Sequence, residues 1–189
     1  WRLALGKTKD EIANEFYDSE KYTYDSTSQK WKTKFNPENY KAKNFSEEVI
    51  DAKTGKIVIN LGDTINYVKA KKLSNDGLKD ILVSQDSIYG KFLHNDVKVG
   101  EKEDEIFKIG TELNETIIEQ ILNANITTLK ISVTNSINKG PYLLNTLLND
   151  KNNTKDEAIT EIYKMLRPGE PPTIEIASQI FNNLFFSSD

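Results

Sequence analysis

The 189-residue sequence contains no cysteine, a single histidine and only two arginines. Without cysteine the chain can form no disulfide, thiolate zinc site or cysteine nucleophile, which fits a reducing compartment such as the cytoplasm. The lone His94 cannot build a histidine-rich metal site, and we interpret it as a surface residue near a strand end rather than a catalytic group. No apolar run approaches the roughly 18 residues that a membrane-spanning helix needs.

Charge is distributed unevenly along the chain. The sequence carries 25 basic and 29 acidic side chains, for a net charge of −4. Residues 45–135 hold 11 basic and 15 acidic groups, so this middle part contains the whole acidic excess. A phosphate backbone would be repelled by it. We therefore expect any DNA-facing surface to lie in the flanking parts of the sequence.

The N-terminal part predicts one helix followed by one hairpin. Thr8 and Glu11 have the spacing of a capping box, in which each side chain accepts a hydrogen bond from the other residue's amide. Beyond this helix, residues 22–24 and 30–35 alternate between polar and apolar or aromatic positions. This alternation predicts two strands around a polar turn at residues 25–29.

The middle part contains an internal repeat with an offset of 48 residues, in which residues 59–66 align with 107–114. Each copy predicts a strand, a glycine turn, a short helix, a turn and a second strand. Asn114 is the expected N-cap of the second helix, and the sequence Asn75-Asp76-Gly77 is the expected end of the first. No paired titratable groups recur at matching positions, so the repeat gives no indication of catalysis.

The C-terminal part predicts two helices joined by a stiff loop. Thr154 and Glu157 form a second capping box, and the following helix must end at residues 167–169, where proline and glycine stand. Two further prolines at 171–172 hold the chain extended, and Thr173 caps the last helix. The apolar positions at helical spacing are Ile159, Ile162, Tyr163 and Leu166 in the first helix and Ile176, Ala177, Ile180, Phe181 and Leu184 in the second.

Residues 161–186, EIYKMLRPGEPPTIEIASQIFNNLFF, resemble the β subunit of bacterial DNA-directed RNA polymerase. The resemblance is strong over residues 139–187, moderate over residues 4–17, and mainly one of pattern in the middle, for example at residues 51–56 (DAKTGK). Leu3 stands where the family usually has an arginine, so any role of that arginine is not transferred to this chain.

The resemblance implies an α+β fragment of the polymerase lobe, which is one jaw of the cleft that holds DNA. Residues 1–44 and 136–189 would form the lobe base. Residues 45–135 would form a lineage-specific, β-rich insertion of two strand-helix-strand modules, at about 47–88 and 89–135. The loop 167–173 resembles the gate loop, which faces the clamp near the non-template strand; it comprises Arg167, Pro168, Gly169, Glu170, Pro171, Pro172 and Thr173.

The same resemblance implies the partners and the chemistry of the parent complex. The partners would be the β′, α and ω subunits, the sigma factor, a NusG-type elongation factor and DNA, in the cytoplasm and without a membrane. The parent complex is a nucleotidyltransferase whose Mg²⁺ is bound by another subunit, β′. No catalytic residue and no cofactor is therefore expected within this fragment.

Two interpretations of Arg167 remain open. Its planar guanidinium on a rigid loop suits contact with phosphate or a base edge, since every other basic position except Arg2 is lysine. Alternatively, its side chain caps the last carbonyl groups of the preceding helix.

Three further motifs have simpler explanations. Residues 30–43 interleave five lysines with aromatic side chains, which would suit single-strand binding by stacking, but a strand with one buried face explains the pattern as well and is preferred. The acidic run 101–105 lacks the spacing of a calcium loop and predicts a solvated turn. Residues 51–56 have too few glycines for a phosphate loop and predict a β-turn.

Two rival functions belong to other classes. The first is a free-standing module that binds other proteins through the repeated region. The second is a small hydrolase that works through two carboxylates, which requires a pair within working distance in a pocket. No pair in the sequence points to such a site.

Overall fold

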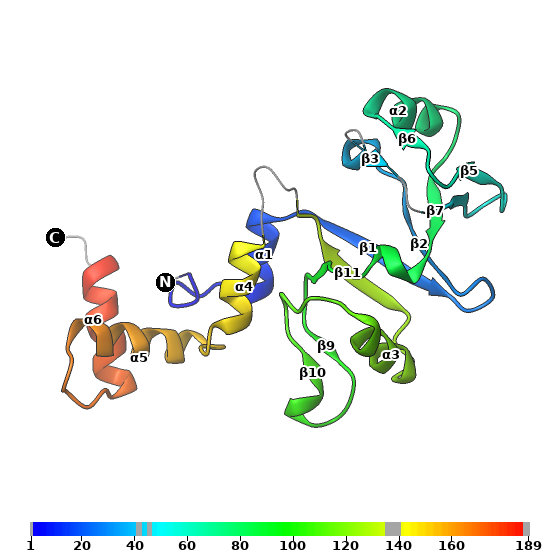
Figure 1. Cartoon of the computed structure of the whole chain (residues 1–189). Helices are drawn as coiled ribbons and strands as arrows, with labels where there is room; N and C mark the ends of the chain where they lie inside the picture. Colours follow the sequence, from blue (N-terminus) through cyan, green and yellow to red (C-terminus); the bar gives the residue numbers. More distant parts are fainter. Residues whose placement is uncertain (1, 41–42, 45–46, 135–140, 187–189) are drawn as a thin grey trace. The chain divides into compact units, whose positions relative to one another are not determined.

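The computed structural model describes residues 2–40, 43–44, 47–134 and 141–186 (Figure 1). It divides into two compact units, of which unit 1 contains Trp1–Tyr17 and Thr134–Asp189 and unit 2 contains Asp18–Val133. Helices and antiparallel strands are both present, so the predicted α+β class is confirmed. Within the described ranges, no helix has the length and apolar character needed to cross a membrane.

The first boundary between the two units lies between Tyr17 and Asp18, whereas the sequence predicted it at residues 44/45. The hairpin of residues 19–34, which we expected in the lobe base, belongs to unit 2. The reason is that both of its strands pair with strands from the repeated region. Residue 45 and the predicted second boundary at 135/136 fall outside the described residues, as do Gly140 and Ser187 of the family resemblance.

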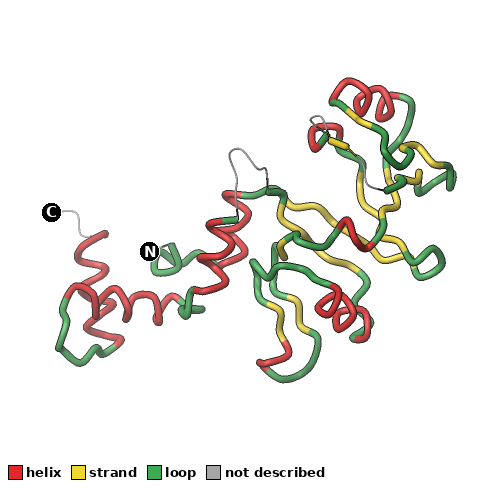
Figure 2. The backbone as a smooth tube through the Cα atoms, viewed as in Figure 1, coloured by secondary structure: helices red, strands yellow, loops and turns green. Residues whose placement is uncertain are grey.

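Unit 1 is helical in its described part, as Figure 2 shows by its red and green segments. Its helices are α1 (Lys9–Phe16), α4 (Tyr142–Asn149), α5 (Lys155–Leu166) and α6 (Ile174–Phe185). Helices α1 and α4 are in contact, and the ammonium group of Lys9 donates to the carbonyl oxygens of Leu147 (3.1 Å) and Asp150 (3.0 Å). Since these carbonyls belong to the end of α4, the lysine satisfies groups that have no partner inside the helix.

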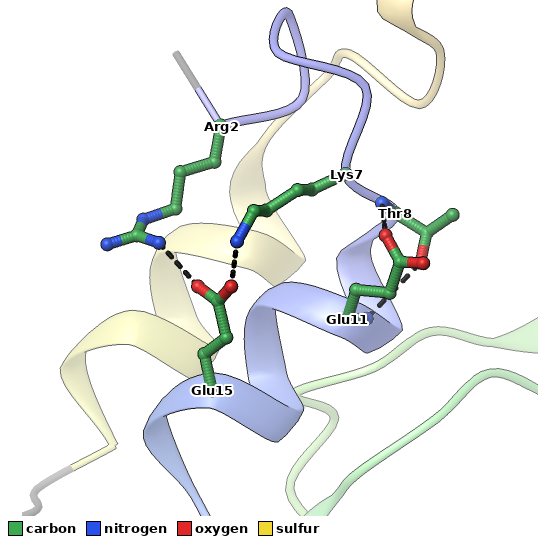
Figure 3. Close-up of polar contacts among 5 residues, drawn as sticks. All are labelled: Arg2, Lys7, Thr8, Glu11 and Glu15. Carbon is green, nitrogen blue, oxygen red and sulfur yellow. Dashed lines mark hydrogen bonds and ion pairs between the residues drawn. The ribbon is translucent and has the colours of Figure 1, made fainter.

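The start of α1 is fixed by the predicted capping box (Figure 3). The Glu11 amide donates to the Thr8 hydroxyl (3.2 Å), and the Thr8 amide donates to the Glu11 carboxylate (2.9 Å). One turn further along, Glu15 accepts hydrogen bonds from both Arg2 and Lys7. These contacts fold the N-terminal segment back against α1.

Unit 2 contains a seven-stranded antiparallel sheet with the order β5-β4-β7-β2-β1-β11-β8. Two small two-stranded sheets, β9-β10 and β3-β6, accompany it. The strands are β1 (Ser19–Asp25), β2 (Lys30–Lys34), β3 (Lys43–Asn44), β4 (Val49–Asp51), β5 (Ile57–Ile59), β6 (Thr64–Ile65), β7 (Asp80–Val83), β8 (Phe92–Leu93), β9 (Val97–Lys98), β10 (Ile106–Phe107) and β11 (Thr128–Ser132). The helices of unit 2 are α2 (Tyr67–Asn75) and α3 (Glu115–Asn123), with short 3₁₀ turns at Pro37–Asn39, Gln85–Ser87 and Glu103–Glu105.

The β1–β2 hairpin occupies the centre of the main sheet. Its two strands pair with each other only at their turn ends, where Thr23 lies opposite Lys32 and Tyr24 opposite Trp31. On its other edge, β1 pairs with β11, and on its other edge β2 pairs with β7. The hairpin therefore joins the two halves of the repeated region into one sheet.

One face of this sheet is buried by α2 and α3. Trp31 is completely buried at its centre, with the Tyr24 ring 5.2 Å away between centroids. A single apolar cluster continues from these strands to Ala70 of α2 and Ile118 of α3. Burial of an aromatic side chain of this size makes a large hydrophobic contribution, so this cluster holds unit 2 together.

The two repeated stretches adopt the same local structure at the predicted 48-residue offset. Gly62 and Gly110 both have positive φ, and Asn66 and Asn114 both cap helices of the same length. In each cap the asparagine side chain accepts from the amide three residues along the chain, at 2.9 Å in both helices. The strands β7 and β11 then begin at equivalent positions.

The two helices also end in the same way. Gly77 follows α2 with a φ of +105°, and Asn125 follows α3 with a φ of +60°. In both places the next amide donates to a carbonyl five residues back, from Leu78 to Leu73 (3.1 Å) and from Ile126 to Ile121 (3.2 Å). This is the hydrogen-bond pattern of a Schellman cap, which requires a left-handed residue. Asparagine is one of the few side-chain-bearing residues that adopts this conformation readily.

His94 is not a surface residue, so the sequence-based interpretation was wrong on this point. Its side chain is 2% exposed, and Nδ1 lies 2.8 Å from the hydroxyl oxygen of Ser132, which is also buried. The His94 amide donates to the carbonyl of Lys130 in β11 (3.0 Å). This main-chain bond continues the pairing of β8 with β11 and draws the ring into the interior.

The helix-end geometry makes a specific prediction for Gly77. We expect Gly77→Ala to lower the free energy of unfolding of the 189-residue chain by about 1–2 kcal/mol, because a Cβ is unfavourable at positive φ. A Cβ there would meet no atom within 4 Å, so the cost arises from the backbone alone. Urea-induced unfolding followed by circular dichroism measures the change.

The matched control is Gly77→Asn, which places at this position the residue that α3 uses. It should cost clearly less than the alanine variant, and Asn125→Gly should leave the unfolding midpoint nearly unchanged. Equal losses for alanine and asparagine at position 77 would show that the left-handed conformation is not the cause.

A second prediction concerns the buried tyrosine of β1. Burial, followed by the nearby Glu20 carboxylate, raises the pKa of Tyr22 above its usual value. A raised pKa in the folded state means that the stabilising contribution is present below about pH 10 and is lost as the pH rises further. The free energy of unfolding should therefore decline above about pH 10, and it should decline less steeply in Tyr22→Phe. Parallel pH profiles for the two proteins would contradict this assignment.

Candidate functional site

The loop 167–173 is held between two capped helices of unit 1. Helix α5 begins with the predicted capping box, in which the Glu157 amide donates to the Thr154 hydroxyl (3.3 Å). The Glu157 carboxylate accepts from the amides of Asn153 (2.7 Å) and Thr154 (3.2 Å), and these bonds lower the pKa of Glu157. The negative carboxylate at the helix start is thereby fixed near the positive end of the helix dipole.

Helix α5 ends at Leu166, where the sequence predicted its end. The Arg167 amide makes the last helical hydrogen bond, to the Tyr163 carbonyl at 2.9 Å. Gly169 follows with a φ of +92°, and a Cβ at this position would have no atom within 4 Å. The turn therefore depends on the backbone freedom of glycine and not on close packing.

The loop itself is exposed. Arg167, Pro168, Gly169, Glu170, Pro171 and Thr173 are all exposed, and Pro172 is half-buried. Helix α6 then begins at Ile174, with the Thr173 hydroxyl accepting from the Ile176 amide (3.4 Å). The seven predicted residues thus form one continuous exposed segment between α5 and α6, which pack against each other.

A side-chain hydrogen bond connects the loop to helix α5. The hydroxyl of Tyr163, a residue only 4% exposed, donates to the Glu170 carboxylate at 2.9 Å. The carboxylate is also 3.7 Å from a guanidinium nitrogen of Arg167. The hydrogen bond to Glu170 is the main cause that raises the pKa of Tyr163. Glu170 therefore links the buried face of α5 to the only arginine in the loop.

This geometry bears on the two interpretations of Arg167. Over half of its side-chain surface is exposed, and its guanidinium pairs with the Glu170 carboxylate. Because the guanidinium turns toward Glu170, the structure gives no support to a side-chain cap on the α5 carbonyls. An exposed ion pair of this kind is weak, so the guanidinium can exchange its partner at little cost. Whether that partner is DNA stays a prediction.

The hydrogen bond between Tyr163 and Glu170 was not predicted from the sequence. Tyr163 had been assigned to the apolar face of α5, where it does lie, but its hydroxyl reaches a residue seven positions away across the turn. Helical spacing cannot reveal such a contact, because it depends on how the chain folds back after Gly169. A buried tyrosine generally needs a partner for its hydroxyl, and this was the available signal.

The apolar faces of α5 and α6 are only partly covered. Three of the apolar positions at helical spacing are exposed: Leu184 (59%), Leu166 (51%) and Ile176 (46%). Four other large apolar side chains of this region are exposed as well: Met165 (63%), Phe186 (63%), Ile174 (58%) and Phe185 (48%). Exposed apolar side chains thus lie on both helices that flank the loop, and such side chains can contact another surface.

The lysine-rich strand and residues 51–56 adopt the structures that the sequence analysis preferred for them, a strand with one buried face and a β-turn. Trp31 and Phe35 are buried, so the lysine-rich strand has the predicted buried face and offers no stacking platform on that side. Asp51 accepts from the Lys53 amide (2.8 Å) and the Thr54 hydroxyl (2.9 Å) in a β-turn that includes Gly55 at positive φ. In the part of the chain that the structure describes, no group of three or more histidine, aspartate or glutamate side chains could hold a metal ion.

Curated proteins that are similar to this chain align with almost its whole length. The chain is 35% identical over 187 residues to a protein of Rickettsia conorii named DNA-directed RNA polymerase subunit beta, and 35% identical over 188 residues to the protein of that name from Rhizobium leguminosarum bv. trifolii. The corresponding protein of Rickettsia felis is 34% identical over 187 residues. These alignments cover 98%, 99% and 98% of this chain.

The chain spans only 13% of the length of each of these relatives. It matches no protein-family model. The alignments nevertheless run through both units and include the exposed loop of α5 and α6, in agreement with the resemblance found in the sequence. Over almost its whole length, the chain therefore matches one segment of the bacterial DNA-directed RNA polymerase β subunit.

Proposed function

We propose that this chain is the lobe segment of a bacterial RNA polymerase β subunit and helps to form the DNA channel of the assembled enzyme. Unit 1 would be the lobe base, and unit 2 would be the inserted region with its two strand-helix-strand modules. The alignment with β subunits over nearly the whole chain supports this assignment. The proposed insertion then includes the β1–β2 hairpin, because the hairpin pairs with both repeated stretches.

The loop 167–173 carries the functional part of the proposal, as the gate loop of the channel. Its exposure between two capped helices is the observation that supports this role. A short loop with three prolines loses little conformational entropy when it contacts a ligand. A guanidinium at its edge suits charge-assisted hydrogen bonds to phosphate.

The proposal assigns no chemical step to this segment. Nucleotidyl transfer would occur elsewhere in the polymerase, on Mg²⁺ that another subunit binds. The contribution of the segment would be to position DNA and to bind neighbouring parts of the enzyme.

The proposed partners follow from the parent complex. They are the β′, α and ω subunits, the sigma factor, a NusG-type elongation factor and DNA, all in the cytoplasm. The exposed apolar side chains of α5 and α6 support extensive contact of unit 1 with other protein surfaces.

The gate proposal predicts a defect for Arg167→Ala placed in the whole polymerase. We expect a shorter lifetime of the open promoter complex. We also expect the dependence of its stability on salt to become shallower by about 0.9 in the log-log slope, the value for one lost phosphate contact. Filter binding or fluorescence measurements over a range of salt concentrations test both quantities.

Two variants serve as controls for this experiment. Arg167→Lys keeps the charge and should retain most of the salt dependence, whereas Glu170→Gln removes the competing carboxylate and should not shorten the lifetime. An Arg167→Ala enzyme with an unchanged lifetime and salt dependence would exclude a DNA contact by this residue.

The bracing hydrogen bond predicts a separate effect on the loop. Tyr163→Phe removes the donor to Glu170, so amide hydrogen exchange at Gly169 and Glu170 should become a few-fold faster at neutral pH, while the amides in the middle of α5 remain protected. Because the pKa of Tyr163 is raised in the folded state, the wild-type loop should keep its protection up to about pH 10 and lose it above that pH.

The control is Tyr142→Phe, which removes a hydroxyl from a side chain that is 81% exposed. It should leave the exchange rates of the loop unchanged. If Tyr163→Phe left them unchanged as well, the loop would be held by its prolines and not by Glu170.

A further inference from the structure

The main sheet of unit 2 has a second face, opposite the one that α2 and α3 cover. The register of β2, β1 and β11 places five lysines on this face, which we call the lysine face: Lys21, Lys30, Lys32, Lys34 and Lys130. Four of them are exposed and Lys30 is half-buried. Unit 2 is acidic as a whole, so this concentration of positive charge does not follow from composition.

The arrangement of these lysines is unfavourable for the isolated sheet. Lys21 of β1 lies directly opposite Lys130 of β11, and like charges directly opposite in a sheet are destabilising. Lys32 lies opposite Thr23 of β1, and this threonine supplies no negative charge to compensate the lysine. Among the residues that the structure describes, no carboxylate lies within ion-pair distance of any of the five ammonium groups.

The nearby carboxylates are largely engaged elsewhere. Asp25, opposite Lys30, accepts from the Thr27 amide (3.0 Å) and the Ser28 hydroxyl (2.8 Å) in the hairpin turn. Glu20 accepts from the Tyr22 hydroxyl (3.1 Å) and from the Asn39 side chain. Asp80 lies opposite Lys34 and is the remaining acid beside the lysine face.

The sheet is also hollowed where β1 and β2 separate. A depression of about 650 Å³ lies there, lined by Lys21, Lys32, Lys34 and the hydroxyl-bearing Ser19 and Thr23, with Glu20 and Asp80 also on its wall. Ammonium and hydroxyl groups are the donors that proteins use most for phosphate oxygens. The depression therefore offers a place where a phosphate can approach three lysines at once.

We propose that the lysine face is a second DNA-binding surface, which holds the phosphate backbone of duplex DNA without reading its sequence. Duplex DNA is favoured over single strands because Trp31 of β2 and Phe35, which follows β2, are buried on the opposite face and cannot stack on bases. The lysine face offers point charges and no planar side chain for base edges, so its contribution is affinity and not specificity. It lies in unit 2 and is independent of the gate loop in unit 1.

The test uses the 189-residue chain and a fluorescently labelled duplex of mixed sequence, with binding followed by anisotropy between about 50 and 200 mM salt. Five phosphate contacts predict a log-log slope near −4.5, from about −0.9 for each contact. The triple variant Lys21→Gln, Lys32→Gln, Lys130→Gln should reduce the slope to about −2 and weaken binding by more than about tenfold at the low-salt end.

The matched control removes the same charge from α2, through Lys69→Gln, Lys71→Gln and Lys72→Gln, all of which are exposed. This variant should keep the slope of the wild-type chain. Arg167→Ala should also keep it, which separates the lysine face from the gate loop. Urea unfolding provides a check on folding, and Lys21→Gln alone should raise the midpoint because it removes the repulsion of Lys130.

Three results would overturn the proposal: undetectable duplex binding by the wild-type chain at the lowest salt, equal losses in the two triple variants, or stronger binding of a single strand than of a duplex of the same length. If the lysine-face variant instead lost binding to polyglutamate while the chain ignored DNA, the face would serve an acidic protein and the DNA assignment would be wrong.

Discussion

The hairpin of β1 and β2 is the constraint on which unit 2 depends. Its strands pair with each other over a few residues, and the outer edge of each strand pairs with a different repeated stretch. Neither stretch could bury the face of its own helix alone, since each contributes only short strands. Trp31 at the centre fills the space between the two halves and is fully buried. Removing the hairpin would leave two small modules without a common core.

The parts of the fold that the sequence predicted correctly are those controlled by local hydrogen bonds. Thr8, Asn114, Thr154 and Thr173 each begin a helix through a contact only three residues long, and such contacts can be read from spacing alone. The burial of His94 could not be read in this way, because it depends on the pairing of β8 with a strand almost forty residues further along. Periodicity shows which residues are apolar, but not what covers them.

The same limit applies to the candidate site. The end of α5 and the start of α6 follow from proline, glycine and a capping threonine, so sequence reasoning predicts that residues 167–173 connect the two helices. The brace between Tyr163 and Glu170 depends on the path of the chain after Gly169, and the exposed side chains of Leu166 and Leu184 depend on the limited area that two short helices can cover. Both require the three-dimensional structure.

The order of strands in the main sheet has a consequence for the behaviour of the molecule at high concentration. The outermost strands, β5 and β8, are three and two residues long. A strand of this length exposes few unpaired amide and carbonyl groups, which gives a foreign strand little to pair with. The longer strands, β1 and β2, are enclosed by neighbours on both sides. Edge-to-edge growth of the sheet into fibrillar assemblies is thereby discouraged by topology, without charged or proline residues at the edges.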